Sequence, residues 1–301
     1  AVENQPVDEW SALALNETDP MTASLALIAL SRQGDASLQG DLIEALGRFN
    51  LTKTDETTTL ALLRAYALCF TRMGEPDQSI KDSVIARLDP LLPAKSDEVN
   101  TELLRVLVYL DTPGIIEKGL ALMADSRPEV IPDWAELISR NTGYGSTIQK
   151  MLDNHPPSLK IYYALMLRNI RYGWSMQQRE EYFTFINEAS QKYSGGNQYA
   201  AFLGYIRDDA LANCSDAEKV ALAPITGQSL EALPDFEVTA PVGPDESWTL
   251  KSALAAVNES GLKGRDFNNG RNGFYVVGCV KCHSFDGAGG AVGPDLTSVG
   301  N

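Results

Sequence analysis

The sequence predicts an all-α protein in two parts, a long array of helices followed by a short segment of different composition. Two observations predict the helices: apolar residues recur every three or four positions through most of residues 20–224, and short turn sequences separate these runs. A third observation predicts the boundary, because prolines punctuate residues 234–248 and each disfavours helix in the residue before it. With 301 residues and 44% apolar content, the chain can form a sizeable core.

Three helical hairpins are predicted in order along the first part, with apolar residues at helical spacing on both arms. Their arms are residues 25–30 and 38–49, residues 60–70 and 80–88, and residues 103–110 and 115–123. Side-chain oxygens at Asp19, Thr54-Asp55 and Ser96 are placed to cap the starts of helices. These starts lie about 35 and 42 residues apart, a period typical of HEAT or armadillo-like repeats. We therefore expect an α-solenoid over residues 1–233, with a less regular helical bundle as the alternative.

The later helices of the first part are less regular. Residues 128–154 are predicted to form a weaker pair around a turn at residues 142–146. The helices of residues 160–206 are rich in aromatic side chains, which we interpret as repeat core, with a docking face for a partner domain as the alternative. Residues 234–248 are predicted to be an extended linker, and residues 249–258 a short helix that opens the C-terminal segment.

The C-terminal segment contains Cys279-Val280-Lys281-Cys282-His283, the pattern of a c-type haem attachment site. Two thiols three positions apart can add to the two vinyl groups of one haem, and the adjacent imidazole can bind its iron. A Cys-x-x-Cys pair can also form a redox disulfide or half of a zinc site, and these alternatives stay open. A zinc site would need further ligands, but Cys69, His155 and Cys214 occur singly along the chain.

Both flanks of this motif carry a further pattern. Downstream, residues 284–296 are rich in glycine and end in Gly293-Pro294-Asp295-Leu296. Upstream, residues 264–277 have the length of a short helix, and Phe274 lies five residues before Cys279. Together these features resemble class I cytochromes c, in which a Gly-Pro-x-Leu segment follows the haem motif at about this distance. The spacing of Phe274 is one residue longer than in that family.

The resemblance to class I cytochromes c implies roles for individual residues. The Pro294 carbonyl would accept a hydrogen bond from Nδ1 of His283, which orients the imidazole and makes it a better iron donor. Leu296 would pack on the haem face, and Phe274 would be the aromatic residue that packs beside the motif. His283 would be the proximal ligand of the iron, and Cys279 and Cys282 would hold the porphyrin.

The whole tail, residues 263–301, is similar to the haem-binding domain found in planctomycete- and verrucomicrobium-type bacteria. In those proteins the domain often follows helical repeats, and it is sometimes joined to a β-propeller of the quinoprotein or sugar-dehydrogenase kind. The resemblance covers about 40 residues closely and the rest of the chain only in architecture. It implies a small cytochrome c domain over residues 249–301.

That cytochrome c domain is expected to be truncated at its C-terminus. Such domains continue for several dozen residues past the Gly-Pro-x-Leu segment and supply a methionine as the sixth iron ligand. This sequence stops 18 residues after His283 and has no methionine after Met176. Either the chain is a fragment of a longer polypeptide, or the iron is five-coordinate or ligated from elsewhere, so the sixth ligand stays unknown. His155 lies in an Asn-His-Pro-Pro sequence typical of a surface turn.

Charge and missing motifs narrow the function. The net charge of −15 argues against nucleic acid as a partner, and no apolar run is long enough for a transmembrane segment. Residues 261–301 carry a charge of +1, so the acidic excess lies in residues 1–260. The sequence has no hydrolase elbow, dinucleotide fingerprint or His-Glu-x-x-His motif, so we expect no catalytic activity beyond electron transfer in this chain.

The sequence therefore predicts a periplasmic or otherwise extracytoplasmic bacterial protein that carries one covalent haem c on a helical-repeat scaffold. Its partner would be a redox protein or a dehydrogenase domain. Two alternatives stay open: the chain is a cytochrome-bearing piece of a larger sugar or alcohol dehydrogenase, or it is a haem-based sensor or interaction scaffold.

Overall fold

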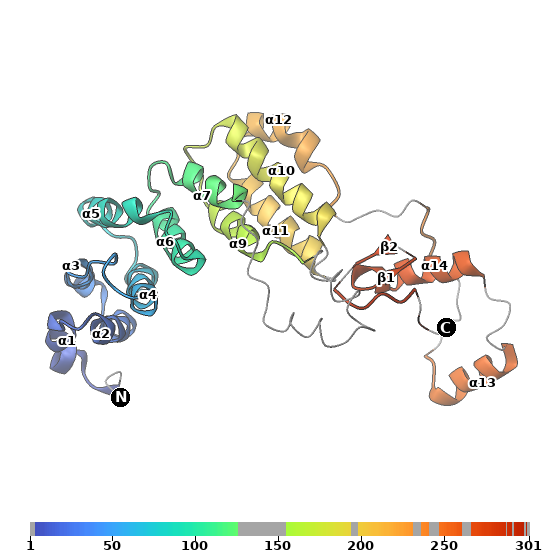
Figure 1. Ribbon diagram of the computed structural model, residues 1–301, viewed down its shortest axis with the longest axis horizontal. Coiled ribbons are helices and arrows are strands. Elements are labelled where there is room, and N and C mark those ends of the chain that lie inside the picture. Colours follow the sequence, from blue (N-terminus) through green and yellow to red (C-terminus); the bar gives the residue numbers. More distant parts are fainter. Residues whose placement is uncertain are drawn as a thin grey trace. The chain divides into compact units, whose positions relative to one another are not determined.

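A computed structural model describes residues 4–125, 155–193, 198–230, 236–240 and 247–260, and residues 266–299 apart from residues 287, 291 and 298. Regular structure in these residues is almost entirely helical, which confirms the all-α prediction for them (Figure 1). No helix among them is long and apolar enough to cross a membrane. The predicted helix pair at residues 128–154 lies outside the described residues. Most of the predicted linker, residues 234–248, does so too.

The helices of the first part follow closely on one another. They are α1 (Val7–Asn16), α2 (Pro20–Gln33), α3 (Gln39–Gly47), α4 (Glu56–Met73), α5 (Gln78–Leu88), α6 (Asp97–Tyr109), α7 (Ile115–Ala124), α9 (Ser158–Leu167), α10 (Met176–Lys192), α11 (Tyr199–Ala212) and α12 (Asp216–Thr226), with short 3-10 turns at Ala36–Leu38 and Asp89–Leu91. The C-terminal part contains α13 (Leu250–Ser260), α14 (Phe267–Val276), the 3-10 turn η5 (Cys279–Lys281), β1 (Ser284–Phe285) and β2 (Ala288–Gly289).

The chain divides into two compact units. The first consists of Ala1–Arg127, Ser158–Tyr182 and Asp208–Leu222, and the second of Pro128–Pro157, Phe183–Arg207 and Ala223–Asn301. Within the first unit α2, α4, α6 and α9 pack side by side in one row, while α1, α3 and α5 form a second row (Figure 1). The core lies on the inward faces of these helices, where Leu27, Leu62 and Leu103 are completely buried. Burial of such leucines is the main stabilising term.

Capping residues start the helices where the sequence predicts. The side chains of Asp19, Asp55 and Ser96 accept hydrogen bonds from the backbone N–H groups three residues later, at 2.8, 3.0 and 3.3 Å. Each bond satisfies one of the N–H groups that has no partner inside its helix. At the other end, Gly74 closes α4 with a φ of 92°, a left-handed conformation that glycine adopts at little cost.

Two details of the predicted first part are wrong. The array begins with α1, before the predicted start at residue 20, and the buried Trp10 and Ala14 anchor this helix. The predicted pairing of residues 60–70 with 80–88 is also not the main packing of either segment, because α4 packs on α2, α3 and α6, whereas α5 packs on α3 and α6. Only Val84 and Leu88 of α5 are buried, so this helix has little apolar surface to offer α4.

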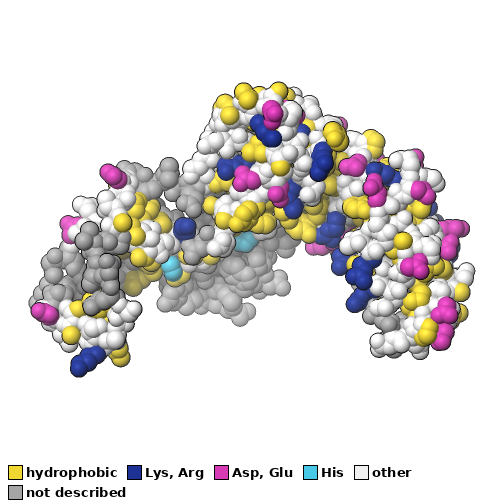
Figure 2. Space-filling model, turned by 180° about the vertical axis from the view of Figure 1, so that it is seen from behind, with side chains coloured by type: hydrophobic (Ala, Val, Ile, Leu, Met, Phe, Trp, Pro, Cys, Tyr) yellow, Lys and Arg dark blue, Asp and Glu magenta, His cyan; other side chains and the backbone are white. Residues whose placement is uncertain are grey.

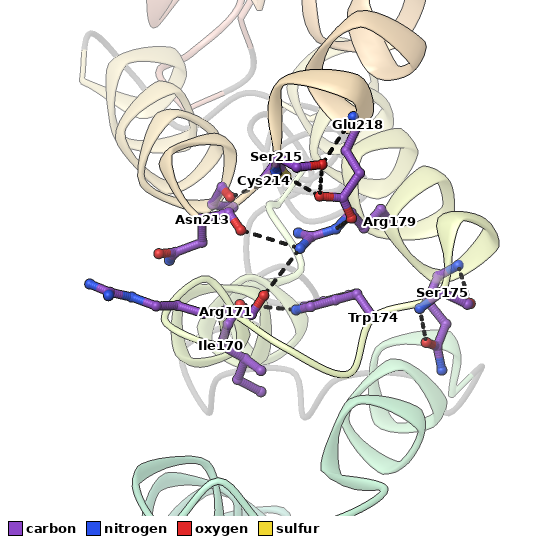
Figure 3. A network of polar contacts seen from close by, with 11 residues as sticks. Ile170, Arg171, Trp174, Ser175, Arg179, Asn213, Cys214, Ser215 and Glu218 are labelled. Atoms are coloured by element: carbon purple, nitrogen blue, oxygen red, sulfur yellow. Dashed lines mark hydrogen bonds and ion pairs between the residues drawn. The ribbon is translucent and has the colours of Figure 1, made fainter.

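A buried arginine ties α10 to the start of α12 within the first unit (Figure 3). Nε of Arg179 donates to Glu218 at 2.7 Å, and its terminal nitrogen donates to the carbonyl oxygens of Asn213 and Arg171 at 3.3 and 3.4 Å. The guanidinium also lies over the ring of Trp174, 5.4 Å from the centroid. Ser215 caps α12, because its hydroxyl accepts from the N–H of Glu218, while the Glu218 carboxylate accepts from the N–H and hydroxyl of Ser215. One side chain therefore fixes three chain segments.

The surface of the helices carries the acidic excess. Figure 2 shows acidic side chains spread over much of the visible face. Many of the carboxylates are used locally, as in the caps at Asp19 and Asp55 and the ion pairs of Asp89 with Lys118 and Asp209 with Arg168. Dispersed charge of one sign keeps a protein soluble, and it does not define a single binding site.

Candidate functional site

The helix α14 leads directly into the cysteine motif. Its cap is Asp266, whose side chain accepts from the N–H of Asn269 at 2.7 Å. The helix ends at Val276, and Gly278 follows with a φ of 78°. Because a side chain disfavours this left-handed conformation, Gly278 is suited to redirecting the chain from the helix into the motif.

The motif itself is a tight turn closed on its first cysteine. The N–H groups of Cys282 and His283 both donate to the carbonyl oxygen of Cys279, at 3.2 and 2.9 Å. This turn carries both thiols, which are free; Cys279 is exposed and Cys282 half-buried. Among the described residues, no three His, Cys, Asp or Glu side chains form a group that could hold a metal ion. A zinc site at this turn would therefore need ligands from residues outside those described.

A two-residue hairpin follows the motif. β1 pairs antiparallel with β2, so that Ser284 lies opposite Gly289 and Phe285 opposite Ala288. Asp286 follows β1 with a φ of 51°, a left-handed conformation that aspartate tolerates, and Asp-Gly is a favoured sequence between the strands of a two-residue hairpin. The glycine-rich composition of residues 284–296 predicts only a loop here, so the hairpin is an addition to that expectation.

The rest of the loop folds back along the motif through backbone hydrogen bonds. Gly290 donates to the carbonyl oxygen of Val280 and Gly293 to that of Cys282, both at 2.7 Å. The N–H of Leu296 donates to the carbonyl oxygen of Ser284 at 2.8 Å. The Gly-Pro-Asp-Leu segment is thus fixed beside the cysteines by the main chain, independently of any cofactor.

This return of the chain places Pro294 next to the imidazole of His283. Nδ1 of His283 lies 2.9 Å from the Pro294 carbonyl oxygen, the contact that the cytochrome resemblance implies. Because a carbonyl oxygen can only accept, Nδ1 must carry the proton, and the lone pair of Nε2 is left for a metal ion. Such an outer hydrogen bond is the usual way in which a protein orients a metal-binding histidine.

The backbone of Gly293 packs against the same imidazole, a contact that the sequence does not predict. A Cβ atom at this position would lie 2.7 Å from both Nδ1 and Cε1 of His283, closer than real contacts allow. The backbone of Gly293 therefore lies against the ring, and only glycine leaves room for it. The presence of glycine before a proline was the one signal in the sequence.

Aromatic side chains gather beside the motif. The ring of Phe285 lies 6.1 Å from that of Phe267 and 6.3 Å from that of Phe274, centroid to centroid. Phe267 is 55% exposed and Phe285 37%, and Leu296 is only half-buried. The sequence predicts Phe274 and Leu296 as residues of the site. It does not predict Phe267 and Phe285, because their contacts depend on the hairpin.

These features fit a haem group. An oriented imidazole, two free thiols on one turn and incompletely buried apolar side chains are what a covalently attached porphyrin requires from a protein. His155, the other histidine, is exposed, and its Nδ1 lies 2.9 Å from the carbonyl oxygen of the adjacent Pro156, as expected of a surface turn. Cys69 and Cys214 are buried, and both thiols are free.

Comparisons with known proteins do not assign the chain to a family. No protein-family description matches it, and neither the curated proteins nor the solved structures contain a significant match.

Proposed function

We propose that this chain is an extracytoplasmic electron-transfer protein that carries one covalently attached haem c. Cys279 and Cys282 would form the two thioether bonds, and His283 would bind the iron through Nε2. The observation that carries this proposal is the hydrogen bond between Nδ1 of His283 and the Pro294 carbonyl oxygen, because it puts the lone pair of the neutral ring on Nε2 and fixes the plane of the ring.

The residues around the imidazole would tune the site in two ways. The bond to Pro294 raises the basicity of His283, which favours the oxidised iron. The apolar side chains of Phe274, Phe285 and Leu296 exclude water, which favours the reduced, less charged iron. Bound haem would supply the redox chemistry, a single iron that alternates between the ferric and ferrous states.

The helical units would serve as the scaffold and recognition surface. Two rows of helices packed in sequence support the α-solenoid expected from the sequence, and such arrays present extended binding faces. Their acidic surface favours a partner with a basic contact face, either a soluble redox protein or a dehydrogenase domain.

Co-expression with a bacterial cytochrome c maturation system tests the proposal. We expect a mass increase of one haem per chain that survives denaturation, together with a strong Soret absorption band. The double variant Cys279→Ser/Cys282→Ser should lose the covalent mass, whereas Cys214→Ser, which changes a buried thiol outside the motif, should keep it. A wild-type chain that matures without any covalent haem would refute the proposal.

A second candidate is a haem-based sensor, the alternative that the sequence leaves open for the same motif. An electron carrier prefers six-coordinate, low-spin iron, whereas a sensor needs a position open to a small ligand. The spectrum of the reduced protein, with and without carbon monoxide, separates the two. Rapid binding of carbon monoxide would favour the sensor, and a spectrum unchanged by the gas would favour the electron carrier.

A further inference from the structure

A short segment preceding the C-terminal helices is bound to α14 at two points. The side-chain oxygen of Asn272 accepts from the N–H of Thr239 at 2.9 Å, and the side-chain nitrogen of Asn272 donates to the carbonyl oxygen of Thr239 at 2.7 Å. One amide therefore pairs with both backbone groups of a residue 33 positions earlier in the chain. Because donor and acceptor are both matched, the contact fixes the register of the segment on the helix.

A second contact holds the same segment one turn along the helix. The ring of Phe236 meets that of Tyr275 edge to face, with centroids 5.1 Å apart. The guanidinium of Arg271 lies over the same Phe236 ring, 4.5 Å from its centroid. Phe236 is half-buried by these partners although it lies in a stretch without regular secondary structure. Both interactions are of kinds that favour a defined geometry.

The segment occupies one side of α14 and leaves another side to the cysteine motif. Successive residues of an α-helix turn by about 100°, so Arg271, Asn272 and Tyr275 share one side. Phe267 and Phe274 lie on a neighbouring side, and they are the two residues of α14 whose rings are near Phe285. A helix gripped on the first side cannot rotate without withdrawing its phenylalanines from the second.

We propose that residues 236–240 form a strap that belongs to the cofactor-binding part of the chain and sets the rotation of α14, with Asn272 as a positioning residue. This inference rests on the proposed haem function, since the apolar side that the strap holds in place is the one assigned to the porphyrin. Residues 236–240 belong to the predicted linker of residues 234–248, and in the structure this part of the linker is bound to α14. Pro241 supports it, because it biases Ala240 toward extended backbone.

Hydrogen exchange tests the strap without any cofactor. In the protein matured without haem, the Thr239 amide should exchange more slowly than an unstructured amide, and Asn272→Ala should raise its exchange rate by about tenfold or more. Asn272→Asp keeps the acceptor but loses the donor, so its effect should be intermediate. Asn269→Ala, which removes an exposed asparagine side chain one turn earlier on the same helix, is the matched control and should leave the Thr239 rate unchanged. An unprotected Thr239 amide in the wild type, or one unaffected by Asn272→Ala, would overturn the strap.

The positioning role is tested in the haem-loaded chain. Asn272→Ala should move the reduction potential to a more negative value, because looser phenylalanines admit water to the site and water favours oxidised iron. Asn269→Ala should not move it. If Asn272→Ala releases the Thr239 amide while the potential stays constant, the positioning role is wrong and the strap is only a tether. If no haem attaches to the wild type, the proposed function fails, and exchange at Thr239 still decides whether the strap exists.

Discussion

The carbonyl oxygen of Pro294 lies 2.9 Å from Nδ1 of His283, although the two residues are 11 positions apart. Backbone hydrogen bonds of Gly293 and Leu296 to residues on either side of His283 hold this approach, so the geometry does not depend on side chains alone. In this contact Nδ1 is the donor, so the neutral ring carries its proton there and its lone pair on Nε2. The loop therefore orients the imidazole through main-chain contacts, as its proposed role as the iron ligand requires.

We predict that Gly293→Ala impairs the site. The added methyl group would lie 2.7 Å from Nδ1 and Cε1 of His283, so the ring must move away from the Pro294 carbonyl oxygen. We expect less haem per chain, measured by denaturing mass spectrometry, and an altered spin state in the molecules that do carry it. The imidazole resonances of the haem-free protein should shift as well, which reports on the ring without the cofactor.

Gly273→Ala is the matched control for that change. Nothing lies within 4 Å of a Cβ atom built at Gly273, which is inside α14. Replacing a helical glycine by alanine gains about 0.5–1 kcal/mol of stability, so this variant should bind haem normally and unfold at a slightly higher temperature. Equal haem content in the two variants would show that Gly293 does not constrain the imidazole.

Local features of the fold could be predicted from the sequence, and long-range ones could not. The caps at Asp19, Asp55 and Ser96 were predictable because a cap and the amide it binds lie three residues apart. The hairpin at Asp286 was also within reach, because Asp-Gly between short strand-like pairs is a turn signal that the glycine-rich interpretation obscured.

The contacts that shape the candidate site join residues that are far apart in the sequence, so their closeness in space could not be predicted. Asn272 and Thr239 are 33 positions apart, and no periodicity marks either one. Gly293 was visible only as part of a family-like segment, since its role depends on where the His283 ring lies. The sequence also predicts that each helix packs mainly on the next one, whereas α2 packs mainly on α4. Packing between every second helix arises only when the whole array folds, so no single hairpin sequence indicates it.

We predict that the four cysteines differ sharply in reactivity in the haem-free protein. Burial raises the pKa of the Cys69 thiol to about 12, and burial also raises the pKa of the Cys214 thiol. Since the thiolate is the nucleophile, both should resist alkylation at neutral pH, whereas the exposed Cys279 should react readily. Iodoacetamide treatment followed by peptide mass mapping gives the order of modification. Alkylation of Cys69 in the folded protein as fast as that of Cys279 would contradict the burial.

The helix caps make stability depend on pH. Hydrogen bonds from the Thr58 hydroxyl and backbone N–H lower the pKa of Asp55, so its charged form is favoured in the folded state. A carboxyl group with a lowered folded pKa stabilises the fold above its unfolded pKa, and this contribution is lost as the pH falls through the folded value. Asp55→Asn keeps a capping oxygen but cannot titrate. Its urea midpoint should therefore be lower than that of the wild type at neutral pH. The difference should shrink as the pH falls below the unfolded value of 3.8 and through the lowered folded pKa of Asp55.

If the stability difference between the wild type and Asp55→Asn does not change with pH, the charge of Asp55 contributes nothing to the stability of the fold. Asp19 has the same arrangement, with a pKa lowered by the backbone and side-chain hydrogen bonds of Thr22. Asp19→Asn should therefore give the same convergence, which serves as an internal repeat of the experiment at an independent helix.

The last prediction concerns the arginine that joins α10 to α12. Arg179 is 4% exposed, and replacing it with methionine would remove the donor to Oε1 of Glu218 and to the Asn213 carbonyl oxygen. Breaking a buried ion pair costs about 3–5 kcal/mol, and because the Glu218 side chain is 28% exposed we expect about 3 kcal/mol, measured by urea unfolding. Lys219→Met is the control, since its ion pair with Asp216 is exposed and spans 3.8 Å, so its loss should cost less than about 0.5 kcal/mol. Similar losses in both variants would mean that Arg179 acts as an ordinary surface charge rather than as the connection between its three segments.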